Sequence, residues 1–187
     1  PLFIDFENGT PYWNLEPTWG LTESSSYSPF HSLTDSPNGN YANNLDINAT
    51  LDPFSLQGFT SATLSFWTKY DLETNWDYIY LEISTNGINW TQLDQFTGTQ
   101  TNWVKKQYPL TIYLDEPFIQ IRFNFVSDYS ITRNGMNIDN FEISVVGEGY
   151  KHHQIQIPEG WSGISSYIAL PNIAISNVIG PISNQLI

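Results

Sequence analysis

The chain has 187 residues and a formal net charge of −13, and 40% of its residues are hydrophobic and 16% aromatic. This length suits one well-packed domain with an appendage, while the acidic surface disfavours nucleic-acid partners and suits a cation with oxygen ligands such as calcium. The absence of cysteine excludes disulfides and thiolate metal sites, and no apolar run reaches the ~20 residues of a membrane-spanning helix.

The first predicted strand covers residues 2–6, where apolar and acidic residues alternate in Phe3-Ile4-Asp5-Phe6-Glu7. Alternation with a period of two is typical of a strand with one buried face. The next segment, 8–51, is rich in Pro, Gly, Asn and Ser, so we expect long loops there. A loop region of this length is unusual in a compact domain unless it binds something. Several aromatic residues argue against disorder in it: Tyr12, Trp13, Trp19, Tyr27 and Phe30.

The strand pattern is strong from Ser61 onward. Three sets of residues alternate with more polar neighbours and predict buried faces: Leu64, Phe66 and Thr68; Ile79, Leu81 and Ile83; Ile119, Ile121, Phe123 and Phe125. Asn86-Gly87 predicts a tight turn before a strand at 90–93, and 103–110 is a further predicted strand. No window of 11 or more residues has a helical period. The sequence therefore predicts an all-β protein, an antiparallel β-sandwich of jelly-roll type.

The last predicted strand begins at Gly135. Met136 and Ile138 are expected to face the core, and a change of phase near Asn140 indicates a bulge. Like the first strand, this one places a carboxylate among residues held in a sheet. If the two strands lie side by side, Asp5, Glu7 and Asp139 converge on one cation, in a site for binding or stability rather than for catalysis.

Seven segments, taken in order, resemble the MAM-like group of sandwich domains. The resemblance is closer to the bacterial versions attached to secreted metallopeptidases of the immune inhibitor A and zinc carboxypeptidase types. It covers about 3–145, in the segments 5–9 with Trp13, 32–41, 62–67, 75–84, Trp103, 121–123 and 135–140. Family members often bind calcium between the first strand, an Asp-Ser-Pro loop and the last strand, which implies the ligand set Asp5, Glu7, Asp35 and Asp139. Such a cation would tie a long loop to both ends of the domain and offset loop-closure entropy.

Two segments are predicted along the chain. Residues 1–147 are expected to form the MAM-like sandwich module. Residues 148–187 are expected to be a linker with the start of a following module, or extra strands packed on the sandwich. The part at 158–167 resembles linker sequence in exported proteins of Bacteroidetes-type bacteria. Because the chain starts at Pro1 with neither an initiator Met nor a signal peptide, we expect a fragment or a processed product.

Aromatic residues in the loops are candidate ligand contacts. We expect Trp13, Trp19 and Trp76 to contact a ligand, and with Tyr78 and Tyr80 they would form a platform on which sugar rings stack. The alternative is that tryptophans such as Trp13, Trp67 and Trp103 belong to the core or cover an edge, and that the tyrosines pack across strands.

The sequence indicates no catalytic residues. The histidines are His31, His152 and His153, and no nucleophile-elbow, zinc-protease or phosphate-loop motif occurs. His152 and His153 are adjacent, so on an extended chain their rings point apart instead of toward one metal ion.

These features predict a non-catalytic, calcium-stabilised accessory or adhesion module of a secreted or cell-surface bacterial protein, attached to a hydrolase such as a metallopeptidase. Its expected partners are the neighbouring catalytic domain and an extracellular protein or polysaccharide surface. Three alternatives stay open: a carbohydrate-binding module of a polysaccharide-degrading enzyme, a jelly-roll glycosidase or lyase, and a purely structural spacer.

Overall fold

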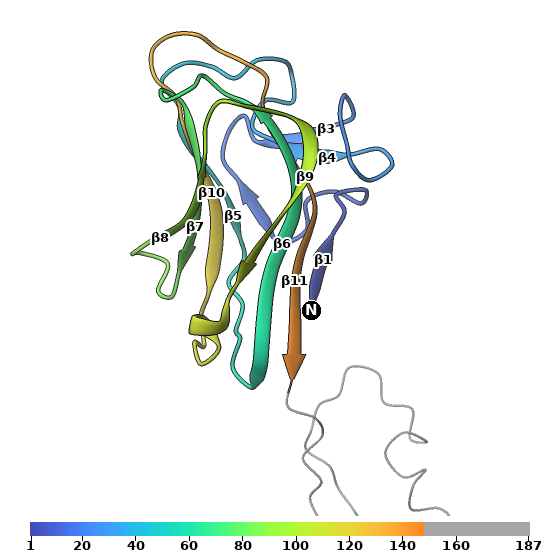
Figure 1. The fold of residues 1–187 in the computed structure, drawn as a ribbon, viewed down its shortest axis with the longest axis vertical. Helices are drawn as coiled ribbons and strands as arrows, with labels where there is room; N and C mark the ends of the chain where they lie inside the picture. The colour runs from blue at the N-terminus through green and yellow to red at the C-terminus, as the bar shows by residue number, and fades with distance from the viewer. Residues whose placement is uncertain (148–187) are drawn as a thin grey trace, which may run out of the picture. The chain divides into compact units, whose positions relative to one another are not determined.

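The computed structural model describes residues 1–147, which form two antiparallel β-sheets packed face to face (Figure 1). The first sheet, here the β11 sheet, has the order β3 (Gly20–Thr22), β4 (Ser32–Thr34), β11 (Gly135–Gly147), β6 (Phe59–Asp71) and β9 (Thr99–Pro109), and β1 (Leu2–Ile4) also pairs with β11. The second, here the β10 sheet, has the order β2 (Trp13–Leu15), β5 (Asp46–Leu51), β10 (Gln120–Val126), β7 (Tyr78–Ser84) and β8 (Thr91–Phe96). A single 3-10 turn, η1 (Thr111–Tyr113), precedes β10. The predicted all-β, jelly-roll-like sandwich is confirmed.

The core lies between the two sheets and follows the predicted alternation. The apolar residues of the three alternating sets are fully buried, and Thr68 is buried with them. Aromatic rings dominate the centre, where Phe123 lies 5.2 Å from Phe66 and 6.0 Å from Trp13 between ring centroids. The period-two pattern therefore identified the buried faces of β6, β7 and β10 correctly.

The region expected to be loops, 8–51, also contains four strands. Three of them, β2, β3 and β4, have only three residues each. The fourth, β5, reads Asp-Ile-Asn-Ala-Thr-Leu and buries only Ala49 and Leu51. Such short or polar strands do not show enough alternation to be recognised, and their positions are set by pairing with longer neighbours instead.

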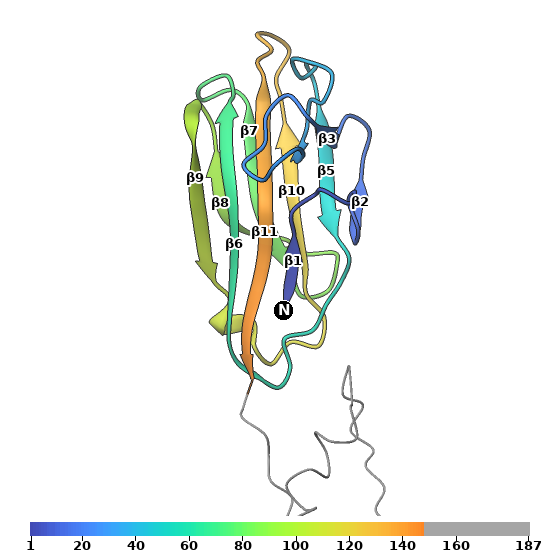
Figure 2. The same ribbon diagram turned by 90° about the vertical axis from the view of Figure 1, so that its right-hand side faces the viewer.

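The pairing partner of β11 changes partway along its length. β4 pairs with Asn137 and Ile138, whereas β1 pairs with Phe141, Glu142 and Ile143 on the same edge. Figure 2 shows β1 lying beside β11, below the loops that lead to β3. Between the two pairings, the register with β6 shifts and Asn140 has a positive φ of 47°. The predicted bulge near Asn140 is therefore confirmed, and Asp139 lies at the point where β4 gives way to β1.

Some predictions fall outside the described residues. One is the linker or following module expected at 148–187. The other is the expectation that the rings of His152 and His153 point apart. Within residues 1–147, no helix is long and apolar enough to cross a membrane.

Truncation of the central aromatic ring should test the core. Phe123→Ala removes a fully buried ring that contacts both sheets, so we expect the free energy of unfolding to fall by about 3–5 kcal/mol. Urea denaturation followed by tryptophan fluorescence would measure it. The control, Tyr129→Ala, removes a ring that is 76% exposed and should change stability by less than about 0.5 kcal/mol. Equal losses for both variants would contradict this packing.

Candidate functional site

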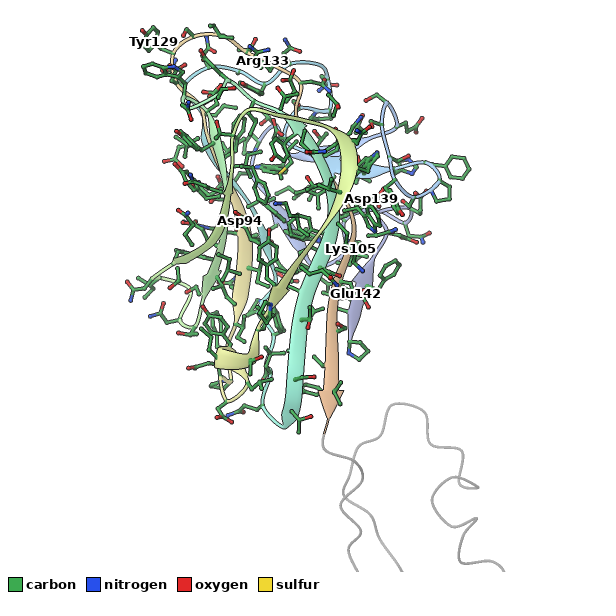
Figure 3. All side chains as sticks on the ribbon, viewed as in Figure 1. Asp94, Lys105, Tyr129, Arg133, Asp139 and Glu142 are labelled. Carbon is green, nitrogen blue, oxygen red and sulfur yellow. The ribbon has the colours of Figure 1, made fainter. Side chains whose placement is uncertain are left out.

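The loop formed by residues 24–31 folds around two carboxylates, those of Glu7 and Asp139. The backbone N–H groups of Tyr27 and Ser28 donate to Asp139 Oδ2 at 2.7 and 2.8 Å. Those of Phe30 and His31 both donate to Glu7 Oε1 at 3.0 Å. Asp139 lies on β11 beside the loops that project from this edge of the sheet (Figure 3). The loop is thus tied to the segment after β1 and to β11.

The hydroxyl of Ser28 lies at the centre of this arrangement. Its Oγ atom is 3.0 Å from the carbonyl oxygen of Asp5, 2.8 Å from Glu7 Oε1 and 3.3 Å from the carbonyl oxygen of His31. It is also 2.9 and 3.1 Å from the two carboxylate oxygens of Asp139. Five acceptor oxygens from four residues therefore surround one hydroxyl group.

One hydroxyl cannot donate to all five oxygens at once. The carboxylate oxygens of Glu7 and Asp139 also accept hydrogen bonds from backbone N–H groups. A serine side chain has a single proton to donate, and neither carbonyl oxygens nor ionised carboxylates can donate one in return. A divalent cation would interact favourably with all of these oxygens. With Ser28 Oγ itself they number six, which is the lower end of the calcium range, and the charges of Glu7 and Asp139 would balance Ca²⁺. The donor set fits calcium, because every ligand is an oxygen.

The protonation behaviour of the two carboxylates differs for physical reasons. Hydrogen bonds from the backbone N–H groups of His31 and Phe30 stabilise the ionised form and lower the pKa of Glu7 to about 2. Burial raises the pKa of Asp139, although N–H and O–H donors from Ser28 and Tyr27 partly oppose the shift. A cation beside Asp139 would act in the same direction as these donors and lower its pKa.

The structure brings together part of the predicted ligand set. Glu7 and Asp139 contribute carboxylate oxygens to the cluster around Ser28, but Asp5 contributes only its carbonyl oxygen. The Asp5 carboxylate instead accepts a hydrogen bond from the backbone N–H of Glu7 at 3.2 Å. Asp5 follows the last residue of β1, so its carbonyl oxygen lies outside the paired part of the strand and can face the 24–31 loop.

Asp35 does not belong to this cluster, which corrects the predicted ligand set. Its side chain is fully buried at the end of β4, where Oδ1 accepts a hydrogen bond from the N–H of Met136 at 2.6 Å. Oδ2 is buried without a partner. Gly135 packs against this carboxylate with a φ of +75°, and a Cβ there would clash with Oδ2, so the position requires glycine. Burial raises the pKa of Asp35 to about 7.

Two of the three predicted ligand-contact tryptophans are in the core, so they are not available for contact. Trp13 and Trp19 are only 7% and 6% exposed, and both rings pack near Phe123. The short strand β2 turns Trp13 inward, in agreement with the alternative that this tryptophan belongs to the core. Trp76, in contrast, is 61% exposed in the turn before β7.

A second group of carboxylates joins two loops at one end of the sandwich, the one between β6 and β7 and the one after β10. Glu73, Asp77 and Asp128 each place one oxygen within 4.8 Å of the others. The two oxygens of buried Asp77 are already hydrogen bonded, to the hydroxyl of Tyr41 at 2.5 Å and to the N–H of Asp128 at 2.8 Å. Burial and the charges of Asp128 and Asp77 raise the pKa of Glu73. The contacts of Asp77 connect the loops, while Glu73 Oε2 is buried without a hydrogen-bond partner among the described residues.

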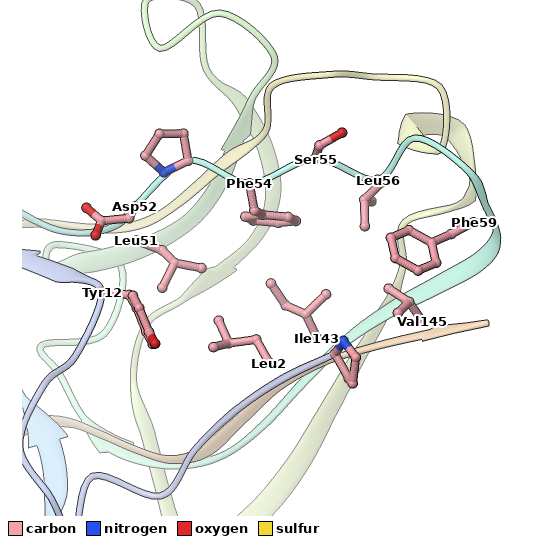
Figure 4. A pocket seen from close by; sticks show the side chains of 12 residues that line it. Leu2, Tyr12, Leu51, Asp52, Phe54, Ser55, Leu56, Phe59, Ile143 and Val145 are labelled. Carbon is pink, nitrogen blue, oxygen red and sulfur yellow. The ribbon is translucent and has the colours of Figure 1, made fainter. Parts of the chain in front are cut away.

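An apolar cleft opens near the chain start, between β1, β5 and the end of β11 (Figure 4). It has a volume of about 260 Å³ and is lined mainly by apolar side chains such as Leu51, Phe59 and Ile143. Its carboxylate, Asp52, already accepts a hydrogen bond from Asn14 at 2.7 Å. The cleft thus has little polar chemistry left with which to orient a ligand.

Sequence reasoning missed the contribution of the 24–31 loop. Ser28 and the carbonyl of His31 lie in a Ser-rich stretch that resembles ordinary loop sequence. Backbone carbonyls have no residue signature, so those of Asp5 and His31 could not be identified from residue type. The Ser-Ser-Ser-Tyr-Ser run was the one visible signal of a hydroxyl-rich loop.

Removing the Asp35 charge should change how stability depends on pH. The folded-state pKa of about 7 is above the ordinary value of 3.8, so between these values the folded protein holds a proton that the unfolded chain releases. The free energy of unfolding should therefore fall as pH rises from about 4 to 7. In Asp35→Asn, melting temperatures measured between pH 5 and 8 should fall less steeply than in the unchanged protein. The exposed control Asp115→Asn should keep the original slope, and an unchanged slope in Asp35→Asn would contradict the expectation.

Comparison with known proteins finds one partial sequence relative and a shared β-sandwich fold. No family model matches the chain. The chain is 33% identical over 107 residues to Bacillopeptidase F of Bacillus subtilis (strain 168), a match that covers 57% of this chain but only 7% of that protein. The chain therefore corresponds to a small part of this relative.

Solved structures show the same fold at low sequence identity. The K3 cleaved adhesin domain of Lys-gingipain from Porphyromonas gingivalis W83 has a TM-score of 0.57 and 17% identity, covering 76% of this chain and 98% of that domain. TmCBM61 in complex with β-1,4-galactotriose has a TM-score of 0.52 and 16% identity, covering 75% and 94%. The CBM22-2 xylan-binding domain of Paenibacillus barcinonensis Xyn10C has a TM-score of 0.51 and 14% identity, covering 78% and 99%. At these identities the likeness concerns the fold alone.

Proposed function

We propose that this chain is a non-catalytic accessory module of a secreted bacterial hydrolase, stabilised by one calcium ion. The proposed ligands are the carbonyl oxygens of Asp5 and His31, the hydroxyl of Ser28, and the carboxylates of Glu7 and Asp139. The observation that carries the proposal is the set of five acceptor oxygens within 3.3 Å of Ser28 Oγ.

Calcium at this position would hold together three parts of the chain that are distant in sequence. They are the segment after β1, the 24–31 loop and β11 at its bulge. The free energy of calcium binding would offset the entropic cost of closing this long loop. The described residues hold no disulfide to do so. Binding only to the folded state would then stabilise the module by mass action.

The accessory role is supported by the proteins that resemble the chain. One is part of a peptidase, and the structural neighbours are adhesin and carbohydrate-binding domains. We therefore propose a secreted or cell-surface location, a neighbouring catalytic domain as one partner, and an extracellular protein or polysaccharide surface as the other. The carbohydrate-binding alternative is favoured by neighbours whose names include a bound galactotriose and a xylan-binding domain.

Calcium removal provides the direct test. At a calcium concentration about 100 times Kd, the melting temperature should be roughly 5–10 °C higher than after removal with EGTA, because ligand binding adds about 2.7 kcal/mol to stability. Scanning calorimetry measures this difference. In Glu7→Gln and Asp139→Asn the calcium-dependent increase should be largely lost, since each removes one of the two balancing charges.

Two matched variants test the ligand set itself. Asp5→Asn and Asp35→Asn should keep the calcium-dependent increase, because the first supplies a carbonyl oxygen and the second lies outside the cluster. Asp115→Asn is the exposed control. If the unchanged protein melts at the same temperature with calcium and with EGTA, and isothermal titration detects no calcium binding, the proposed metal site is wrong.

A further inference from the structure

The outward face of the β10 sheet has a different composition from the rest of the surface. On β7 and β10 the buried residues alternate with Tyr78, Tyr80, Glu82, Arg122 and Asn124, which therefore point away from the core. The pairing register places Glu82 opposite Arg122 and Tyr80 opposite Asn124 on neighbouring strands. Figure 1 shows no strand or loop of the described chain crossing this side of β7 and β10.

Aromatic rings on this face are held in place by their neighbours. Tyr78 and Tyr80 are stacked with ring centroids 5.7 Å apart and an interplanar angle of 13°. Trp90, just before β8, lies 4.1 Å from the guanidinium carbon of Arg122. These rings are neither buried nor fully exposed, so they lie along the sheet with part of each surface open. Fixed rings lose little entropy when a ligand stacks on them.

On the other sheet, comparable rings are already covered by the chain itself. Tyr27 of the 24–31 loop stacks on Trp67 of β6 at 3.9 Å between centroids and lies 6.0 Å from Trp103. On the β10 sheet, the rings of Tyr78, Tyr80 and Trp90 are partly open; on the other sheet, the exposed ring of Phe3 belongs to β1.

Polar groups beside the rings are suited to hydroxyl groups. Arg122 donates from Nε to Glu82 Oε2 at 2.7 Å, which orients both side chains. The exposed amides of Gln92 and Gln95 lie opposite Glu82 and Tyr80 in the register with β8. Carboxamide, carboxylate and guanidinium groups offer paired donors and acceptors that match the adjacent hydroxyls of a sugar ring.

Charge and polarity limit the kind of ligand. The arginine of this face is paired with Glu82, and the chain carries a net charge of −13, so polyanions are disfavoured. A protein interface would require an apolar centre on this face. Among the described residues, none of the strongly exposed large hydrophobic side chains belongs to β7, β8 or β10. A neutral carbohydrate combines apolar C–H faces for the rings with hydroxyls for the polar groups.

We infer that the strip formed by Tyr78, Tyr80, Glu82, Trp90 and Arg122 binds a neutral polysaccharide. The inference rests on the proposed function in that it specifies the surface partner of the accessory module. Trp90 and the Tyr pair lie at different positions along the strands, so the strip would contact more than one sugar unit.

Affinity electrophoresis of the full chain tests this inference with four soluble polymers: xylan, β-1,4-galactan, mixed-linkage β-glucan and polygalacturonate. We expect at least one neutral polymer to retard the protein and polygalacturonate to leave it unretarded. Tyr80→Ala and Trp90→Ala should each weaken retardation about tenfold or more, whereas Tyr80→Phe should largely retain it. Phe3→Ala removes a ring that is 59% exposed on the opposite sheet and should bind like the unchanged protein.

The outcomes separate this inference from the calcium proposal. Circular dichroism melts would first establish that each variant is folded. No retardation by any of the three neutral polymers, or retardation that Tyr80→Ala and Trp90→Ala leave unchanged, would overturn the inference even if calcium raises the melting temperature. Retardation that depends on these residues would support it even if EGTA has no effect on melting.

Discussion

The change of pairing partner along β11 is the constraint on which the candidate metal site depends. β4 and β1 share one edge of this strand, and neither extends across the bulge at Asp139. Backbone groups near such a junction lack the regular hydrogen bonds of a sheet, so the chain must supply other partners. Here the N–H groups of the 24–31 loop and the carboxylates of Glu7 and Asp139 satisfy each other. The irregular position in the sheet and the cluster of oxygens are therefore one feature.

Much of the fold follows from the sequence, because long strands with one buried face impose a period of two. The buried sets on β6, β7 and β10 and the bulge near Asn140 were all predictable for this reason. The short strands β2, β3 and β4 were not, since three residues carry no period and tertiary pairing decides their structure. The inward position of Trp13 agrees with the alternative that it belongs to the core, and its place on β2 explains it.

The candidate site was predictable only as far as side chains define it. Glu7 and Asp139 stand out as carboxylates next to predicted strands, and the structure brings them to the same hydroxyl group. Asp35 has the same residue type and a similar setting, but it turns into the core beneath Gly135. Carbonyl ligands leave no trace in the sequence, which is why the contribution of His31 appears only in three dimensions.

The antiparallel pairing of β1 with β11 has a consequence for how the module fits into a longer polypeptide. Leu2 lies opposite Ile143, so Pro1 and Gly147 lie toward the same end of the sandwich, and Figure 1 shows the start of the chain beside the lower part of β11. Polypeptide joined at these two positions would enter and leave from one pole. The loops around Tyr41, Asp77 and Asp128 would then lie at the opposite pole, because Asp71 pairs with Gly135 at the other end of β11.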